Sequence, residues 1–373
     1  MTKKNFLLLF ILLNTKIFAQ MSAFEINATI KNVDSGFVQM WYPKTDTTFK
    51  LIDSKVSIIN GKFTFKGYLD CPQLTLFVIH TPEVVQTEWF FIDIGQQSMT
   101  IKIDSIVHLA STSKTFHEFI DKYKPSVANI DFKQKEWQLN YRNLLNTYNG
   151  NIPSIKDDSM QILKRKLQSE KDLGLLNYIK HNTFSYVGLT ELSFFIKDNG
   201  YSAIYKQAFS LIDNTLKKSS LGKKTSEKLM SVQSIAIGSF FPSIPIVDTV
   251  GNKIQLDKTF FKEYTLCDFW YSSCGPCISQ FPRLNDIYSK WRNKGFEIIG
   301  ISTDLKKSEM SWKTAIKKHN LLWQQYWDVD YAEATKLSIV LFPTNFLLDK
   351  TGKIIAKNIE PAQLEKFLEL NIK

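Results

Sequence analysis

The feature that most constrains the fold of this chain is a pair of cysteines two residues apart, placed where an apolar run ends and a helix-like segment begins. Cys274 and Cys277 enclose Gly275 and Pro276 and directly follow the apolar run 264–270. Such a run predicts a strand that ends just before the first thiol. The unpaired N–H groups of the following helix favour thiolate over thiol, so we expect the pKa of Cys274 to lie below that of a free cysteine. Cys277 lies one turn further in, where it can close a disulfide with Cys274, and this arrangement indicates a redox dithiol.

The cysteine spacing has two other interpretations besides the redox dithiol. Half of a zinc site would need a second pair of thiol or imidazole ligands. Cys71 and Cys267 form no second pair of this spacing, and the five histidines are scattered. We therefore expect no metal and no cofactor other than the disulfide itself. A purely structural disulfide is the other alternative, although Gly and Pro between the cysteines suit an exposed pair that cycles between redox states.

The N-terminal residues have the pattern of a secretory signal peptide. Lys3 and Lys4 precede the apolar run 6–13, which is too short to span a bilayer, and Ala19 supplies the small residue of a cleavage site. Residues 1–19 are predicted to be removed. No later apolar stretch has the length of a transmembrane helix. The mature chain is therefore expected to be exported, periplasmic and soluble, without stable insertion into the membrane.

Length and charge narrow the function further. A chain of 373 residues is expected to form about two or three domains. The formal net charge is +11, but the lysines are spread along the chain and form no basic block with interleaved aromatic residues. This dispersal argues against nucleic acid as a partner.

The first part of the mature chain, residues 20–110, has the pattern of β structure. Apolar residues alternate with polar ones from Phe24 to Ile30, and Asn60-Gly61 between two short strand-like runs is typical of a hairpin. Short strands at near-regular spacing predict a small all-β domain, either a sandwich or a barrel.

The period of the apolar residues changes after this region. Over residues 111–237 they recur at three- to four-residue steps, as at Leu163 and Leu167, which predicts a segment of roughly five helices broken near residues 149–153. Over residues 238–373 strand-like runs alternate with helix-like segments, which predicts an α/β domain with a central sheet flanked by helices.

Residues 268–277, with the sequence DFWYSSCGPC, resemble the active-site strand and turn of the thioredoxin superfamily. Residues 238–373 as a whole resemble the exported TlpA/ResA-type branch, including its central insertion at 295–327. The β and helical regions before them resemble the amino-terminal extension found on such proteins. The resemblance implies a thioredoxin-like fold, with a mixed central sheet, for the C-terminal domain.

The resemblance also implies roles for three residues in the chemistry. Cys274 is expected to attack the disulfide of a substrate protein, and Cys277 to resolve the mixed disulfide that results. Asp268 matches the family's buried carboxylate beneath the resolving cysteine, where it can accept and return a proton.

The residues expected to contact the substrate follow in the same way. Pro343 matches a cis-proline opposite the dithiol, which leaves the backbone of Phe342 free to pair with an extended substrate. Trp270 is expected to pack beside the dithiol as an apolar platform. Gly275 and Pro276 between the two cysteines complete this expected contact surface.

Three positions depart from the family's pattern. Ser273 stands where most members carry an aromatic residue directly before the first cysteine, and Phe342 is larger than the usual residue before the cis-proline. Cys267 replaces an apolar residue next to Asp268. Because side chains alternate along a strand, we expect Cys267 to face the opposite side of the sheet from Asp268 and to be a core thiol.

The function that these observations favour is reduction of disulfides in exported client proteins, followed by recharging of the dithiol from a membrane electron donor. A reducing role in cytochrome c maturation is one that the TlpA/ResA resemblance allows. The alternatives are a thiol-disulfide oxidase or isomerase, which often has His between the cysteines, and a thiol peroxidase, which has Thr before a single reactive cysteine. Neither pattern is present at Cys274. A homodimer formed through the helical segment is left open.

Overall fold

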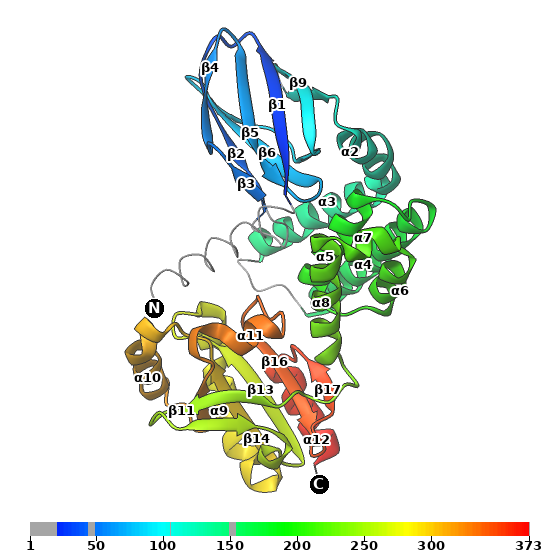
Figure 1. Cartoon of the computed structure of the whole chain (residues 1–373). Coiled ribbons are helices and arrows are strands. Elements are labelled where there is room, and N and C mark those ends of the chain that lie inside the picture. The colour runs from blue at the N-terminus through cyan, green and yellow to red at the C-terminus, as the bar shows by residue number, and fades with distance from the viewer. Residues whose placement is uncertain (1–20, 44–48, 105, 149–153, 373) are drawn as a thin grey trace, which may run out of the picture. The chain divides into compact units, whose positions relative to one another are not determined.

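A computed structural model describes residues 21–43, 49–104, 106–148 and 154–372 (Figure 1). The predicted signal peptide, residues 1–19, and the predicted break at 149–153 lie outside this part. The chain divides into two compact units, one made of Met1–Phe195 with Ala203–Glu227 and the other of Ile196–Ser202 with Lys228–Lys373. No helix of the described ranges is long and apolar enough to cross a membrane.

The β region of the first unit is one ten-stranded sheet that curls into a near-closed barrel, which confirms the predicted all-β domain (Figure 1). The sheet order is β10-β9-β1-β5-β4-β2-β6-β7, with β3 paired to β5 and β8 paired to β6. The strands are β1 (Ser22–Lys31), β2 (Ser35–Trp41), β3 (Phe49–Leu51), β4 (Lys55–Ile59), β5 (Lys62–Leu69), β6 (Gln73–His80), β7 (Val84–Gln86), β8 (Phe90–Ile92), β9 (Gly95–Ile103) and β10 (Val107–Ser111).

Side-chain alternation along β1 explains how this sheet encloses a core. Phe24 and Ile26 are buried, with polar residues between and around them, and Ile26 lies opposite Phe65 of β5. The turn between β4 and β5 is the predicted hairpin, because Asn60 and Gly61 adopt φ values of 49° and 71°. Positive φ at both positions is what a tight hairpin turn requires.

The segment that follows the sheet is helical, as predicted, but its described residues form seven α-helices rather than roughly five, and α5 and α8 each extend from the first unit into the second. The two helices beyond the expected five are short: α2 has four residues and α7 has five. A π-helix (Glu118–Tyr123) joins α2 directly to α3. The helices are α2 (Lys114–His117), α3 (Lys124–Thr147), α4 (Ser154–His181), α5 (Tyr186–Asn199), α6 (Ala203–Leu211), α7 (Asn214–Lys218) and α8 (Ser220–Ser234).

The second unit contains the predicted α/β domain, built on a seven-stranded sheet of order β12-β11-β15-β14-β13-β16-β17. The central strand β13 pairs in parallel with β14 and antiparallel with β16, so the sheet is mixed. The strands are β11 (Ile244–Asp248), β12 (Lys253–Leu256), β13 (Tyr264–Trp270), β14 (Phe296–Ser302), β15 (Gln324–Trp327), β16 (Thr344–Asp349) and β17 (Ile354–Lys357). The helices are α9 (Gly275–Trp291), α10 (Glu309–Lys318), α11 (Ala332–Lys336) and α12 (Pro361–Asn371).

Two apolar clusters cover the two faces of this sheet. Leu266 and Trp270 of β13 belong to a cluster with residues of α9, α10 and α12. Cys267 and Phe269, which alternate with them along the strand, belong to a cluster with Phe346 and residues of α11. The sheet is therefore the middle layer, and α9 lies on the face to which Leu266 and Trp270 point.

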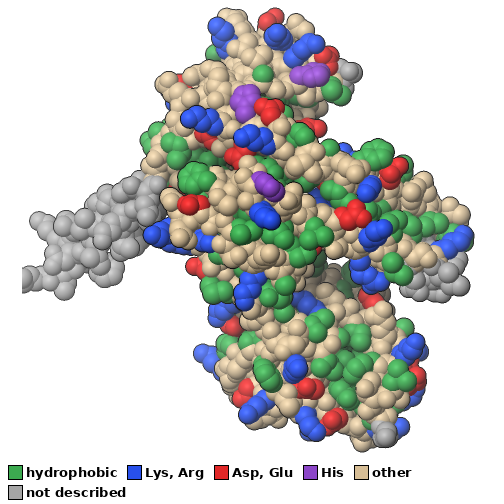
Figure 2. Space-filling model, turned by 90° about the vertical axis from the view of Figure 1, so that its right-hand side faces the viewer, with side chains coloured by type: hydrophobic (Ala, Val, Ile, Leu, Met, Phe, Trp, Pro, Cys, Tyr) green, Lys and Arg blue, Asp and Glu red, His purple; other side chains and the backbone are tan. Residues whose placement is uncertain are grey.

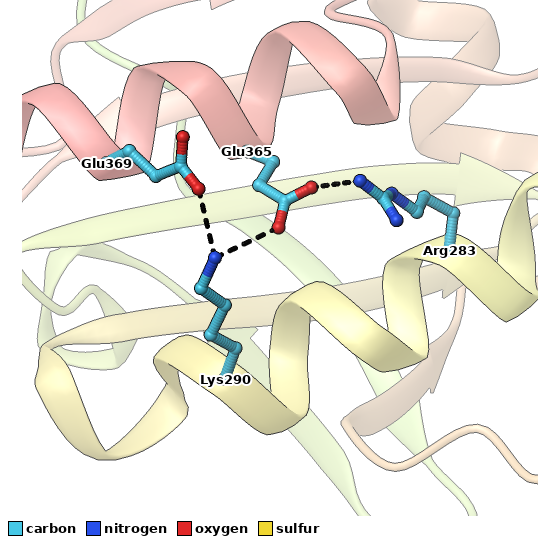
Figure 3. Close-up of polar contacts among 4 residues, drawn as sticks. All are labelled: Arg283, Lys290, Glu365 and Glu369. Carbon is cyan, nitrogen blue, oxygen red and sulfur yellow. Dashed lines mark hydrogen bonds and ion pairs between the residues drawn. The ribbon is translucent and has the colours of Figure 1, made fainter.

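Ion pairs on the outer side join α9 to α12, as Figure 3 shows. Lys290 of α9 contacts Glu365 and Glu369 of α12 at 3.2 and 3.0 Å, and Arg283 also pairs with Glu365. Glu365 is the least exposed member, with 18% of its side chain accessible. These contacts tie α12 to the helix that begins at the two cysteines.

The dispersal of lysines along the sequence is also visible on the surface. On the face shown in Figure 2, Lys and Arg side chains are scattered among acidic and apolar ones over both units.

Candidate active site

The site forms where β13 ends and α9 begins. Cys274 is the N-cap residue of α9 and Cys277 lies in its first turn, with the two Cα atoms 5.3 Å apart and the sulfurs joined in a disulfide. The backbone N–H of Cys277 donates to Sγ of Cys274 at 3.2 Å. The positive end of α9 is therefore directed at Cys274, and once the disulfide is reduced it stabilises a thiolate there.

The disulfide is less accessible than the sequence predicted. Cys274 and Cys277 are each only 1% exposed, whereas Gly275 and Pro276 between them are exposed. The prediction of an exposed pair was wrong for the sulfurs, because both cysteines join the apolar cluster beneath α9 and partly buried side chains, Phe342 among them, pack against that cluster. The two residues that the sequence assigned to substrate contact therefore form the accessible edge of the disulfide.

Asp268 lies on β13 on the same face as the dithiol. It is 2% exposed and lies two residues from both Leu266 and Trp270, on the same face of β13, and those two residues share an apolar cluster with both cysteines. Its Oδ1 atom has no hydrogen-bond partner among the residues that the structure describes. Burial raises the pKa of Asp268 to about 7. The group can therefore hold or release a proton near neutral pH, as an acid-base residue must.

Cys267 faces away from this site, as the sequence predicted. It is fully buried in the cluster with Phe269 and Phe346 on the opposite face of the sheet. Burial, together with the adjacent charge of Asp268, raises the pKa of its thiol. Cys267 is thus a core thiol, unsuited to act as a nucleophile.

Pro343 lies in the loop before β16, and its peptide bond with Phe342 is cis, as predicted. The ring of Phe342 meets the ring of Tyr271 edge to face at 5.4 Å between centroids. This contact joins the cis-proline loop to the segment that leads into Cys274.

Trp270 packs in the cluster that contains both cysteines, as expected, but its side chain is buried inside the domain and does not lie on the surface. It is 1% exposed, its ring meets Phe281 of α9 edge to face, and its Nε1 donates to Oε1 of Gln325 at 3.1 Å. Gly300 leaves the room for Gln325, because a Cβ atom at Gly300 would lie 2.3 Å from that oxygen. Trp270 therefore offers almost no surface to a substrate, whereas the adjacent Tyr271 is partly exposed.

A groove that the sequence did not reveal opens next to these residues. Its volume is about 450 Å³. Its walls come from the segment before Cys274, the loop after β14, the turn before α11 and the cis-proline loop. The main lining residues are Tyr271, Ser273, Asp304, Leu305, Tyr331 and Phe342. The sequence did contain a signal for this groove. Neighbouring parallel strands end at the same edge of a sheet, so the residues that follow β13 and β14 are expected to lie side by side there.

The described residues contain no group of three or more His, Cys, Asp or Glu side chains placed to hold a metal ion. The chemistry that the site offers is that of two thiols and a buried carboxyl.

Comparison with known proteins places this domain in a family. Residues 237–357 match the AhpC/TSA family. Thiol-disulfide oxidoreductase ResA of Bacillus thuringiensis subsp. konkukian (strain 97-27) is 30% identical over 141 residues, which are 38% of this chain and 79% of ResA. ResA of Bacillus subtilis (strain 168) is 27% identical over 123 residues, 33% of this chain and 67% of that protein.

A solved structure, the thioredoxin domain of a thiol-disulfide oxidoreductase from Bacteroides vulgatus, is 34% identical with a TM-score of 0.34, and the match covers 37% of this chain and 99% of that one. The AhpC/TSA match leaves residues 1–236 outside it. Because ResA is matched at 30% identity over more than two thirds of its length, the chain belongs to the ResA-type family of thiol-disulfide oxidoreductases, with an additional region before the thioredoxin-like domain.

Proposed function

We propose that this protein is a periplasmic reductase that transfers two electrons from its dithiol to disulfides of exported client proteins. The observation that carries the proposal is the Cys274–Cys277 pair at the positive end of α9, with the buried carboxyl of Asp268 on the same face of the sheet. The predicted signal peptide supports the exported location.

The reaction runs in two exchanges. The thiolate of Cys274 attacks one sulfur of the client disulfide, forms a mixed disulfide and releases the other client sulfur as a thiolate. Cys277 then gives its proton to Asp268 and attacks the sulfur of Cys274, which releases the second client thiolate and closes the Cys274–Cys277 disulfide. Two electrons pass from the protein to the client, and the client thiolates take up two protons.

Asp268 suits the second exchange because its pKa lies near neutrality. An ordinary cysteine thiol has a pKa of about 8.5, so a nearby base is needed to deprotonate Cys277 at neutral pH. A carboxyl whose pKa is about 7 is ionised in a large fraction of molecules at that pH and can accept the proton.

The direction of electron flow is argued from the residues between the cysteines. Gly275 and Pro276 include no histidine or other cation that would stabilise the Cys274 thiolate further, and a strongly stabilised thiolate is what makes a dithiol an oxidant. Net reduction of clients then requires a membrane donor that returns two electrons to the disulfide. Maturation of cytochrome c, whose apoprotein cysteines must be reduced, is one such use.

The experiment that tests the proposal is reduction of insulin by the fully reduced mature chain, with released thiols counted. The wild type should reduce about one insulin disulfide per molecule, and Cys274→Ser should reduce none. Cys277→Ser should accumulate a mixed disulfide with insulin through Cys274, visible by mass. Absence of both reduction and adduct would contradict the proposal, and fast peroxide consumption by the same protein would favour the peroxidase alternative.

A further inference from the structure

Asp304, which directly follows the end of β14 and Thr303, holds the segment that precedes the nucleophile. Its carboxylate accepts the backbone N–H of Ser272 at 2.8 Å and the hydroxyl of Ser272 at 2.7 Å. The hydroxyl of Ser302 donates to it at 2.8 Å. Asp304 is 6% exposed, so these hydrogen bonds lie in a largely water-free place where they are strong and costly to lose.

Asp304 is itself fixed by its backbone. Its carbonyl oxygen accepts the indole N–H of Trp327 at 2.7 Å and the N–H of Asp330 at 3.3 Å. Its neighbour Thr303 donates twice to the carbonyl of Trp270, at 2.8 and 3.1 Å. The end of β14 thus holds the chain at Trp270 and again at Ser272, on the last residues before Cys274.

These hydrogen bonds fix the backbone of the segment that leads to Cys274. Cys274 donates its N–H to the carbonyl of Tyr271 at 3.0 Å, so a shift of Ser272 moves both Tyr271 and Cys274. The ring of Tyr271 lies against Phe342 before the cis-proline. One carboxylate therefore sets the relation between the reacting sulfur and the groove wall.

The carboxylate also brings charge. Its donors, Ser272 and Ser302, are neutral, and no basic side chain of the described ranges forms an ion pair with it. The other charged groups on neighbouring segments are Asp268 on β13, Lys306 and Lys307 in the loop that follows Asp304, and three acids after β15, namely Asp328, Asp330 and Glu333. A buried negative charge that is hydrogen-bonded to Ser272, two residues before Cys274, disfavours a second negative charge on Cys274.

We propose that Asp304 is a positioning residue for the disulfide exchange: it fixes the segment that presents Cys274 and, through its charge, keeps the dithiol reducing. The inference rests on the proposed function. Destabilising the thiolate destabilises the reduced protein relative to the uncharged disulfide, which makes the dithiol a stronger reductant.

The charge is tested by Asp304→Asn in the mature full-length protein, with the disulfide equilibrated against glutathione buffers. Loss of the charge should shift the equilibrium about three- to tenfold toward the dithiol. The pH dependence of iodoacetamide reaction at Cys274 should move to lower pH in parallel. Asp304→Glu, which keeps the charge, should retain the wild-type equilibrium.

The matched control is Asp330→Asn, because Asp330 is an aspartate in the neighbouring turn after β15, its N–H donates to the carbonyl of Asp304, and its carboxylate accepts the N–H of Lys306 and not that of Ser272. It should leave the glutathione equilibrium unchanged. An unchanged equilibrium and alkylation profile in folded Asp304→Asn would overturn the role of the charge, and so would an equal shift in Asp330→Asn.

Positioning is tested by Ser272→Ala, which keeps the charge of Asp304 and removes one hydroxyl. We expect an unchanged glutathione equilibrium and a slower reaction of Cys274 with insulin by about two- to fivefold. An unchanged rate would overturn the positioning role. Ser272→Ala supplies this test even if Asp304→Asn does not fold. The test of the charge uses alkylation and the glutathione equilibrium, which need no client, so its outcome is independent of whether the protein reduces clients at all.

Discussion

The two units of this protein each contain an acid whose pKa burial raises to about 7, one fully buried and one partly exposed, and only the fully buried one lies on the same face of its sheet as the disulfide. Asp268 is in the thioredoxin-like domain, and Glu191 lies on α5 in the helical part of the first unit. Burial is the main cause of the shift in both.

The two acids differ in their neighbours. Glu191 accepts the hydroxyl of Tyr123 at 2.9 Å, and the nearby charges of Lys171 and Asp131 act on it in opposite directions. Asp268 has an unpartnered oxygen and shares its face of the sheet with a disulfide. The comparison teaches that a raised pKa alone does not indicate a catalytic role, because burial raises the pKa of both acids and only Asp268 shares a face of its sheet with a redox pair.

The sharpest test of this comparison exchanges each acid for its amide. Asp268→Asn removes the proton acceptor for Cys277, so we expect reduction of insulin to slow by about 100-fold, within the range for loss of general acid-base catalysis. Glu191→Gln keeps the acceptor for Tyr123 and should leave the rate unchanged. The measurement is the single-turnover rate with the reduced protein. Equal effects of the two substitutions would break the comparison.

The pH dependence of the same rate separates the two acids again. Resolution requires ionised Asp268, so the wild-type rate should rise through about pH 7 as the carboxyl loses its proton. The rise should disappear in Asp268→Asn and persist in Glu191→Gln. A wild-type rate that is flat between about pH 6 and 8 would show that Asp268 does not accept the proton.

Stability, in contrast, should respond to both acids with the same sign. Each folded-state pKa lies above that of an unfolded carboxyl, so the folded protein binds more protons between about pH 4 and 7. The free energy of unfolding should therefore fall as pH rises through this window and remain lower above it. Asp268→Asn should remove up to about 4 kcal/mol of this loss, and Glu191→Gln less, because Glu191 is partly exposed.

Denaturant unfolding of the oxidised protein at pH 5 and pH 8 measures this difference. The amide variants should gain more on the wild type at pH 8 than at pH 5, because most of the loss builds up between these two pH values. A gain that is the same at both pH values would contradict titration of these carboxyls as its cause.

The sequence predicted the centre of the site better than its surroundings. Strand β13, helix α9 and the opposite orientations of Cys267 and Asp268 follow from local patterns, namely an apolar run, a helix start and the two-residue period of a strand. The exposure of Cys274 does not, because it depends on packing against the cis-proline loop, which lies far away in the sequence. The bonds between Asp304 and Ser272 depend on the pairing of Trp270 with Ser302 across two strands.

In the first unit, too, contacts between residues far apart in the sequence could not be predicted from local patterns. The raised pKa of Glu191 depends on how α5 packs, and its bond joins residues 68 positions apart. The helical period of the segment was predictable, whereas the partner of each inward side chain was not. The run of α2 through a π-helix into α3, which brings Tyr123 to Glu191, has no sequence signal of the kind that marks a hairpin turn.

The smallest expected effect concerns that bond. Tyr123→Phe removes the hydroxyl and leaves Glu191 without its donor, which should cost about 1 kcal/mol in the free energy of unfolding and raise the pKa of Glu191 further. Unlike Asp268→Asn, it should leave insulin reduction unchanged, because Glu191 has no reactive neighbour. The matched control is the double variant Tyr123→Phe with Glu191→Gln. In this background the stability lost through Tyr123→Phe should no longer depend on pH, because the amide that replaces the carboxyl does not titrate. A fall in the reduction rate of Tyr123→Phe at unchanged stability would mean that the helical region takes part in the chemistry, and the contrast between the two acids would then fail.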